Sequence, residues 1–141
     1  MSESARFNMV EAQIRPSHVT DERILAAMNA VPREKFVPGS ARALAYADVP
    51  VQVAPGRFLL DPRSFAKLAQ LADIRSGDRI LDVGPGTGYS SAVLARVGAE
   101  VVALEQDADL VRAASELLAN AVGKVEVVQG GLERRKGPGA L

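Results

Sequence analysis

Two carboxylates and a run of glycines have the spacing of a site that binds a nucleoside. Asp82 ends an apolar stretch, and glycine follows at Gly84, Gly86 and Gly88. Glycine lets the backbone turn tightly and lets a ligand approach the peptide plane. Glu105 ends the next apolar stretch, about twenty residues beyond the first glycine, where an acid can accept hydrogen bonds from both ribose hydroxyls. Together these features predict a nucleoside site.

The glycine spacing indicates which nucleoside is bound. A dinucleotide fingerprint needs glycine at the third position after its second glycine, and Tyr89 stands there. No P-loop run of Gly-Lys-Ser/Thr is present. Asp82 is a poor neighbour for pyrophosphate and a good one for a cation, so S-adenosylmethionine, with a sulfonium and no phosphate, is the predicted cofactor. Glu105 alone would also suit NAD, and a glycine turn without a ligand is a further alternative.

The elements around these residues predict an α/β fold. Residues 80–83 have the branched apolar side chains of a strand, and residues 89–97 have the apolar spacing of a helix. That helix aims its free N–H groups and its positive dipole end at the glycine loop. Residues 101–104 predict the next parallel strand, residues 107–120 a helix closed by Gly123, and residues 125–128 a third strand.

The first sixty residues predict a helical cap. One helix is expected over residues 4–14 with Phe7 on its buried face, and a second follows Thr20 as N-cap. Residues 49–60 read as extended or looped. A third helix is expected to begin at Asp61-Pro62 and to bury Leu68 and Ala72 among others. The predicted units are a helical cap with a substrate loop over 1–62, a cofactor-binding core over 63–131 and a flexible tail over 132–141.

The composition excludes several functional classes. Seventeen basic and seventeen acidic side chains cancel, so no nucleic-acid or membrane-surface partner is expected. The chain has no cysteine, which excludes disulfides and thiolate metal sites, and no metal site is predicted. No apolar run approaches the ~20 residues that cross a bilayer. With 141 residues, of which 48% are hydrophobic, we expect one cytoplasmic domain or a piece of one.

Four motifs, taken in order, resemble the protein-L-isoaspartate O-methyltransferases. They are Val-Pro-Arg-Glu-Lys-Phe-Val-Pro at 31–38, Ala-Tyr-Ala-Asp-Val-Pro-Val at 45–51, the segment 56–62, and the glycine motif at 81–95. The likeness runs from about residue 8 to residue 131. It implies a Rossmann-like class I methyltransferase sheet with a helical N-terminal cap. It also implies an S-adenosylmethionine site made of Asp82, Gly84, Gly86, Thr87, Gly88, Tyr89, Glu105 and Gln106.

By the same resemblance, the methyl acceptor is the free carboxylate of an isoaspartyl residue in damaged protein. A carboxylate is already an anion at neutral pH, so attack on the sulfonium methyl needs no general base. Alignment and desolvation of the two charged reactants supply most of the acceleration. A chain with one histidine and no cysteine can perform this chemistry.

Three positions depart from the family pattern. The family loop usually reads Gly-Gln-Thr-Ile-Ser-Gln-Pro, whereas this chain reads Gly-Arg-Phe-Leu-Leu-Asp-Pro at 56–62. Leu60 therefore stands at the serine position, and Arg57 is a speculative partner for the substrate carboxylate. Gly131 stands where the family commonly has an acid near adenine. A weakly active or inactive cofactor-binding protein is the alternative function, and an NAD-dependent oxidoreductase is less favoured.

Length is a further departure, because family members continue into a fourth strand. In a doubly wound sheet the strand that carries Asp82 lies in the middle, and without its neighbour it exposes an apolar edge. Three explanations are open: a truncated chain, which we favour, self-association through the open edge, or capping of the edge by the tail. A missing strand also opens one wall of the cofactor pocket, so weak affinity is expected.

Overall fold

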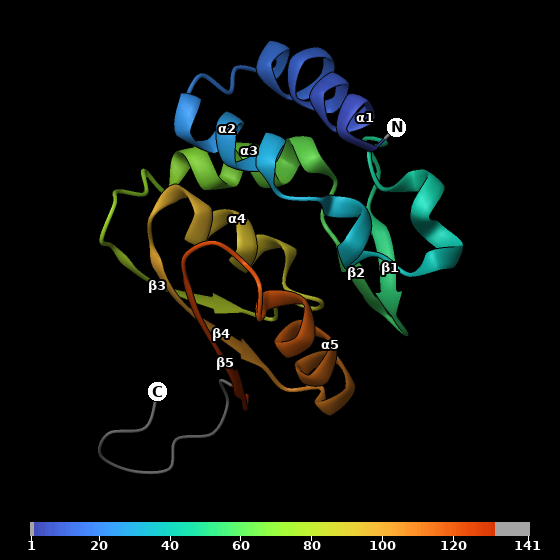
Figure 1. The fold of residues 1–141 in the computed structure, drawn as a ribbon, viewed down its shortest axis with the longest axis vertical. Helices are drawn as coiled ribbons and strands as arrows, with labels where there is room; N and C mark the ends of the chain where they lie inside the picture. The colour runs from blue at the N-terminus through green and yellow to red at the C-terminus, as the bar shows by residue number, and fades with distance from the viewer. Residues whose placement is uncertain (1, 132–141) are drawn as a thin grey trace.

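The computed structural model describes residues 2–131, and the tail predicted over 132–141 lies outside them. Helices precede a small hairpin, and a parallel βαβαβ unit follows (Figure 1). The helices are α1 (Ser2–Asn8), α2 (Glu22–Ala30), α3 (Pro62–Leu71), α4 (Tyr89–Val97) and α5 (Ala108–Leu118). The strands are β1 (Val51–Ala54), β2 (Arg57–Leu59), β3 (Arg79–Val83), β4 (Glu100–Glu105) and β5 (Lys124–Gln129). Shorter turns of helix cover Met9–Ile14, Arg15–Ser17, Arg33–Phe36 and Gly39–Leu44.

The N-terminal helices differ from the sequence prediction in two places. The N-cap of α2 is Asp21 rather than Thr20, because the Asp21 side chain accepts the N–H of Arg23 at 3.0 Å. Phe7 is 52% exposed, although it was expected on the buried face. After Asn8 the winding widens to a π-helix, which shifts the buried face to Met9, Val10 and Ile14.

The segment over 49–60 folds as a two-stranded antiparallel hairpin, β1 and β2, joined by a turn at Pro55-Gly56. Helix α3 then begins as predicted, with Asp61 accepting the N–H of Ser64 at 2.9 Å and proline at the first helical position. Its buried face is Pro62, Phe65, Ala66 and Ala69, while Leu68 and Ala72 are exposed, contrary to the prediction. The i, i+3, i+4, i+7 stripe that begins at Pro62 excludes both positions.

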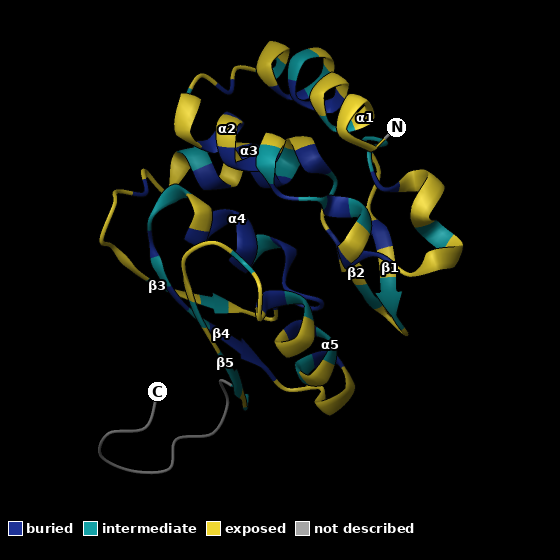
Figure 2. Cartoon of the chain, in the orientation of Figure 1, coloured by how far each residue is buried: buried dark blue, intermediate teal, exposed yellow. Residues whose placement is uncertain are grey.

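The sheet has the order β3-β4-β5, and all three strands are parallel. Helix α4 is buried over most of its length (Figure 2), since it packs on α2 on one side and on β4 and β5 on the other. The predicted α/β class is therefore confirmed. Helix α5 ends at Leu118, two residues before the predicted end at Asn120, so Gly123 does not close it. Gly123 lies at φ +111° against the backbone of Ala95, where a Cβ would come within 2.6 Å of the carbonyl oxygen.

Within the described residues β3 forms an edge of the sheet, as expected from the missing neighbour. Leu81 and Val83 on this strand are 43% and 49% exposed. Self-association through this edge stays a prediction. Buried side chains from Met9 to Leu118 form one continuous hydrophobic core, and the proposed division at residue 62 also stays a prediction. Among the helices of residues 2–131, none is long and apolar enough to cross a membrane.

Candidate functional site

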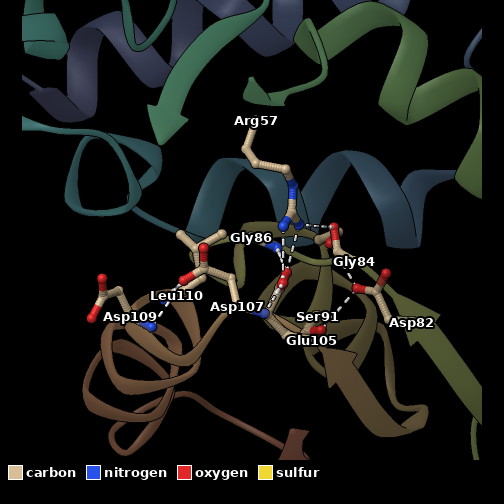
Figure 3. Close-up of polar contacts among 10 residues, drawn as sticks. Arg57, Asp82, Gly84, Gly86, Ser91, Glu105, Asp107, Asp109 and Leu110 are labelled. Carbon is tan, nitrogen blue, oxygen red and sulfur yellow. Dashed lines mark hydrogen bonds and ion pairs between the residues drawn. The ribbon is translucent and has the colours of Figure 1, made fainter. Parts of the chain in front are cut away.

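Three segments distant in sequence meet at the carboxyl ends of β3 and β4 (Figure 3). They are the loop that follows β3, the end of β4 and the start of β2. Glu105 is fully buried at their junction. Its carboxylate accepts the backbone N–H groups of Gly86 at 3.1 Å and Asp107 at 2.9 Å, and it pairs with Arg57 at 2.5 and 2.9 Å. The loop, β4 and the hairpin are therefore joined through one side chain.

Burial by itself would raise the pKa of Glu105, because it disfavours the charged form. The hydrogen bonds from Arg57 and from the N–H groups of Asp107 and Gly86 outweigh burial, so the pKa lies below its usual value. The hydrogen bond to Glu105 in turn raises the pKa of Arg57. Glu105 is accordingly an anion at neutral pH.

Asp82 lies at the end of the neighbouring strand and has different partners. One oxygen of its carboxylate accepts the hydroxyl groups of Ser90 at 2.6 Å and Ser91 at 2.8 Å. Burial raises the pKa of Asp82 despite these two hydrogen bonds. The serines lie in the first turn of α4, so the helix fixes the carboxylate beside the glycine loop. Sequence reasoning missed both serines, although adjacent hydroxyls in the first turn after the loop were a signal.

The glycine loop is held by backbone contacts. The N–H of Gly84 donates to the carbonyl of Leu104 at 2.8 Å, which ties the loop to β4. Gly84 and Gly86 have φ of +68° and +64°, a conformation that side chains disfavour. A Cβ on Gly88 would come within 2.8 Å of Leu118 on α5. The φ of +102° at Gly88 favours glycine there, and a Cβ would force the side chain of Leu118 to shift.

The remaining predicted residues are placed differently. The hydroxyl of Thr87 donates to the carbonyl of Phe36 at 2.7 Å, toward the N-terminal segment. Tyr89 is buried, with its ring edge-on to Phe36 and Phe65 at 5.8 Å each. Gln106 is exposed and lies between Glu105 and Asp107 in the sequence, just after the end of β4. The structure therefore brings together Arg57, Asp82, Gly84, Gly86 and Glu105, and it turns Thr87 and Tyr89 toward the core.

A cavity of about 590 Å³ opens beside the loop and is lined by Asp82, Gly84, Leu60 and Phe58 among others. Leu60 is 48% exposed in its wall. The carbonyl of Leu60 accepts Nη2 of Arg33 at 2.8 Å. Arg33 is completely buried and lies 4.7 Å over the ring of Tyr89, so it anchors this wall. Sequence reasoning recorded Arg33 only as part of a motif and did not assign it this role.

The residues present fit a cationic nucleoside. Two acids stand at adjacent strand ends, and Gly84 is an exposed position of the loop. Gly86 is buried, and a Cβ there would lie against Val53 and Leu59 of the hairpin. A buried acid at the end of the second strand of such a unit suits ribose hydroxyls. Asp82, on the cavity side, suits a positive charge. The parallel βαβαβ order and the glycine loop define the class of Rossmann-like α/β proteins.

Comparison with known proteins then gives the family. The model of the protein-L-isoaspartate(D-aspartate) O-methyltransferase family matches residues 4–133, and the chain belongs to this family. A protein-L-isoaspartate O-methyltransferase of Methanoculleus marisnigri is 43% identical over 126 residues, which cover 89% of this chain and 57% of that protein. Protein-L-isoaspartate O-methyltransferase 2 of Anaeromyxobacter sp. is 39% identical over 99% of this chain and 55% of its own length. The chain thus spans little more than half of these relatives.

Solved structures agree on the fold. A protein-L-isoaspartate O-methyltransferase superposes with a TM-score of 0.74 at 24% identity, over 92% of this chain and 42% of that chain. A protein of this type from Plasmodium falciparum, solved with S-adenosyl-L-homocysteine, gives a TM-score of 0.75 at 22% identity, over 90% of this chain and 63% of that one. The sequence-based family and fold assignments are confirmed.

Proposed function

We propose that the chain binds S-adenosylmethionine and supports methyl transfer to the free carboxylate of isoaspartyl residues in damaged proteins. The observation that carries this proposal is the pair of acids, Asp82 and Glu105, at adjacent strand ends beside an open cavity. Family membership and relatives named for this activity support it.

Each part of the site has a role in this proposal. Glu105 accepts the ribose hydroxyls, and Gly84, an exposed glycine of the loop, lets the nucleoside lie against the backbone. Asp82 faces the positive end of the cofactor from the cavity wall. Thr87 donates its hydroxyl to the carbonyl of Phe36, which makes it a residue that holds the loop.

When bound, S-adenosylmethionine supplies a methyl group on a positive sulfur, and its transfer to a carboxylate oxygen breaks the carbon–sulfur bond and moves no proton. The protein therefore needs no general base. The residues of the site align the two reactants and exclude water from them, and alignment alone can supply about 7–11 kcal/mol of the barrier. Phe58 and Leu60 provide apolar wall on the acceptor side of the cavity.

A second function is favoured by one residue. Leu60, at the family serine position, offers no hydroxyl to orient an acceptor. A protein that binds the cofactor with little or no turnover would show this pattern.

Two measurements test the proposal. Calorimetric titration with S-adenosylmethionine and separately with NAD should give heat with the first alone, and heat with NAD alone would refute the cofactor assignment. Labelled methyl should appear in an isoaspartyl peptide and not in the same peptide with normal aspartate. Binding of the cofactor without label above background would select the second function.

A further inference from the structure

Every acceptor position of the Glu105 carboxylate is taken (Figure 3). Oε1 accepts the N–H of Gly86 at 3.1 Å and Nη2 of Arg57 at 2.5 Å. Oε2 accepts the N–H of Asp107 at 2.9 Å and Nη1 of Arg57 at 2.9 Å. An ionised carboxylate has about four lone-pair sites. A ribose diol can reach Glu105 only when one pair of these donors leaves.

Arg57 is the donor that can leave. The N–H groups of Gly86 and Asp107 belong to the glycine loop and to the capped start of α5, which the fold fixes. Arg57 is instead a long, flexible side chain at the start of β2, next to the turn of the hairpin. Its side chain is 28% exposed, whereas that of Glu105 is fully buried. A nucleoside at Glu105 therefore displaces the guanidinium and keeps both backbone donors.

Once displaced, the guanidinium of Arg57 lies at the border of the cavity that is lined by Leu60 and Asp82. Nη2 of Arg57 is already 3.4 Å from the carbonyl oxygen of Gly84, which lines that cavity. Asp82 in the same wall is bonded to two serine hydroxyls. Asp82 and an anionic acceptor are two negative charges beside the single positive sulfonium of the cofactor, so a second cation at the acceptor lowers their repulsion. Arg33 and Arg79 also line this cavity. Because Arg33 is bonded to backbone carbonyls and Arg79 pairs with Glu100, the freed Arg57 supplies the cation on the hairpin side of the loop.

We propose that Arg57 exchanges partners: it occupies the ribose-binding carboxylate of the free protein and, once the nucleoside displaces it, it binds the carboxylate of the acceptor. This inference rests on the proposed function and makes Arg57 a specificity-determining residue. It follows that the cofactor binds first and increases the affinity of the protein for the acceptor. Because coupling between two binding sites is reciprocal, the acceptor tightens the cofactor by the same factor.

The test is a set of titrations with an isoaspartyl peptide, with and without saturating S-adenosylhomocysteine, which prevents turnover. The variants are Arg57→Gln, which carries the usual family residue, and Arg57→Lys, which keeps the charge but loses the two-pronged geometry. Arg23→Gln is the matched control, because Arg23 is a half-exposed arginine that pairs with Asp21 on α2. Circular dichroism verifies that each variant is folded.

In the wild type and in Arg23→Gln, bound S-adenosylhomocysteine should increase the affinity for the peptide at least about fivefold. Arg57→Gln should bind S-adenosylhomocysteine more tightly than the wild type, because the competing guanidinium is gone, and its weak peptide affinity should not respond to the nucleoside. Arg57→Lys should also bind the nucleoside more tightly and retain part of the coupling. If Arg57 had only a structural role, its replacement would instead weaken the binding of both the nucleoside and the peptide.

Equal or weaker nucleoside binding by Arg57→Gln, or undiminished coupling in that variant, would overturn the exchange of partners. Methyl transfer to the isoaspartyl peptide by the wild type would then still uphold the proposed function. If neither the wild type nor Arg57→Gln binds S-adenosylhomocysteine, both proposals fail. Gain of binding in Arg57→Gln over a wild type that binds too weakly to measure would support the exchange.

Discussion

Gly88 lies directly against Leu118, so that a Cβ at position 88 would come within 2.8 Å of Leu118 Cδ1 and 3.2 Å of Cγ. This contact joins the glycine loop to α5, and a side chain at position 88 would force the side chain of Leu118 to shift. The backbone adds a second constraint, since Gly88 has a φ of +102°.

We predict that Gly88→Ala lowers the free energy of unfolding by about 1–3 kcal/mol, through the strained φ and the displacement of Leu118. Urea unfolding measures the change. Gly39→Ala is the control, because no atom lies within 4 Å of the Cβ it would add, and its effect should stay within about 0.5 kcal/mol. Equal unfolding midpoints for the two variants would contradict the packing role.

Glu105→Ala should be much more destabilising than the same change at Glu100 on the same strand. Loss of the Glu105 carboxylate leaves Arg57 and two backbone N–H groups without their acceptor, which costs about 3 kcal/mol for a buried pair. Glu100 pairs with Lys124 at the surface, at 3.2 Å, and contributes about 0.5 kcal/mol or less. Similar unfolding curves for Glu105→Ala and Glu100→Ala would refute the junction role of Glu105.

The two acids of the site should change stability with pH in opposite directions. Burial raises the pKa of Asp82 above its ordinary 3.8, so its contribution to stability is full below pH 3.8 and is lost as pH rises through the folded value. Partners that outweigh burial lower the pKa of Glu105 below its ordinary 4.5. Its contribution is therefore full above pH 4.5 and is lost as pH falls through the folded value.

Unfolding free energies of the wild type, Asp82→Asn and Glu105→Gln between pH 3 and 7 test this pair of slopes. Relative to Asp82→Asn, the wild type should lose stability as pH rises. Relative to Glu105→Gln, it should lose stability as pH falls below 4.5. Slopes of the same sign would show that the balance of burial and hydrogen bonding described for Asp82 or for Glu105 is wrong.

Leu60→Ser restores the family hydroxyl in the cavity wall and should raise methyl transfer to an isoaspartyl peptide roughly tenfold, the effect of one hydrogen bond gained in the transition state. Leu60 is 48% exposed, so stability should change by less than about 0.5 kcal/mol. Phe58→Ser is the control, since Phe58 is a similarly exposed residue of the same wall. An equal rise in both variants would assign the gain to a wider cavity.

Much of the site was readable from the sequence because its signals are local. The change from strand to helix across the glycines, the acid at the end of each strand and the Asp61-Pro62 helix start each depend on a few adjacent residues. The errors at Phe7, Leu68 and Gly123 concern which face of a helix is buried and where it ends. Those features are decided by neighbours that the periodicity of one segment does not contain.

The sequence by itself determined the α/β order, the glycine loop and the positions of Asp82 and Glu105 at the strand ends, because strand and helix periods and turn residues act over short range. Only the tertiary structure decided that Arg57, 48 residues before Glu105, lies on its carboxylate, and that Gly88 packs on Leu118. These contacts join segments that meet only when the hairpin and α5 close around the loop. A buried charge then binds the donors that the folded chain brings to it.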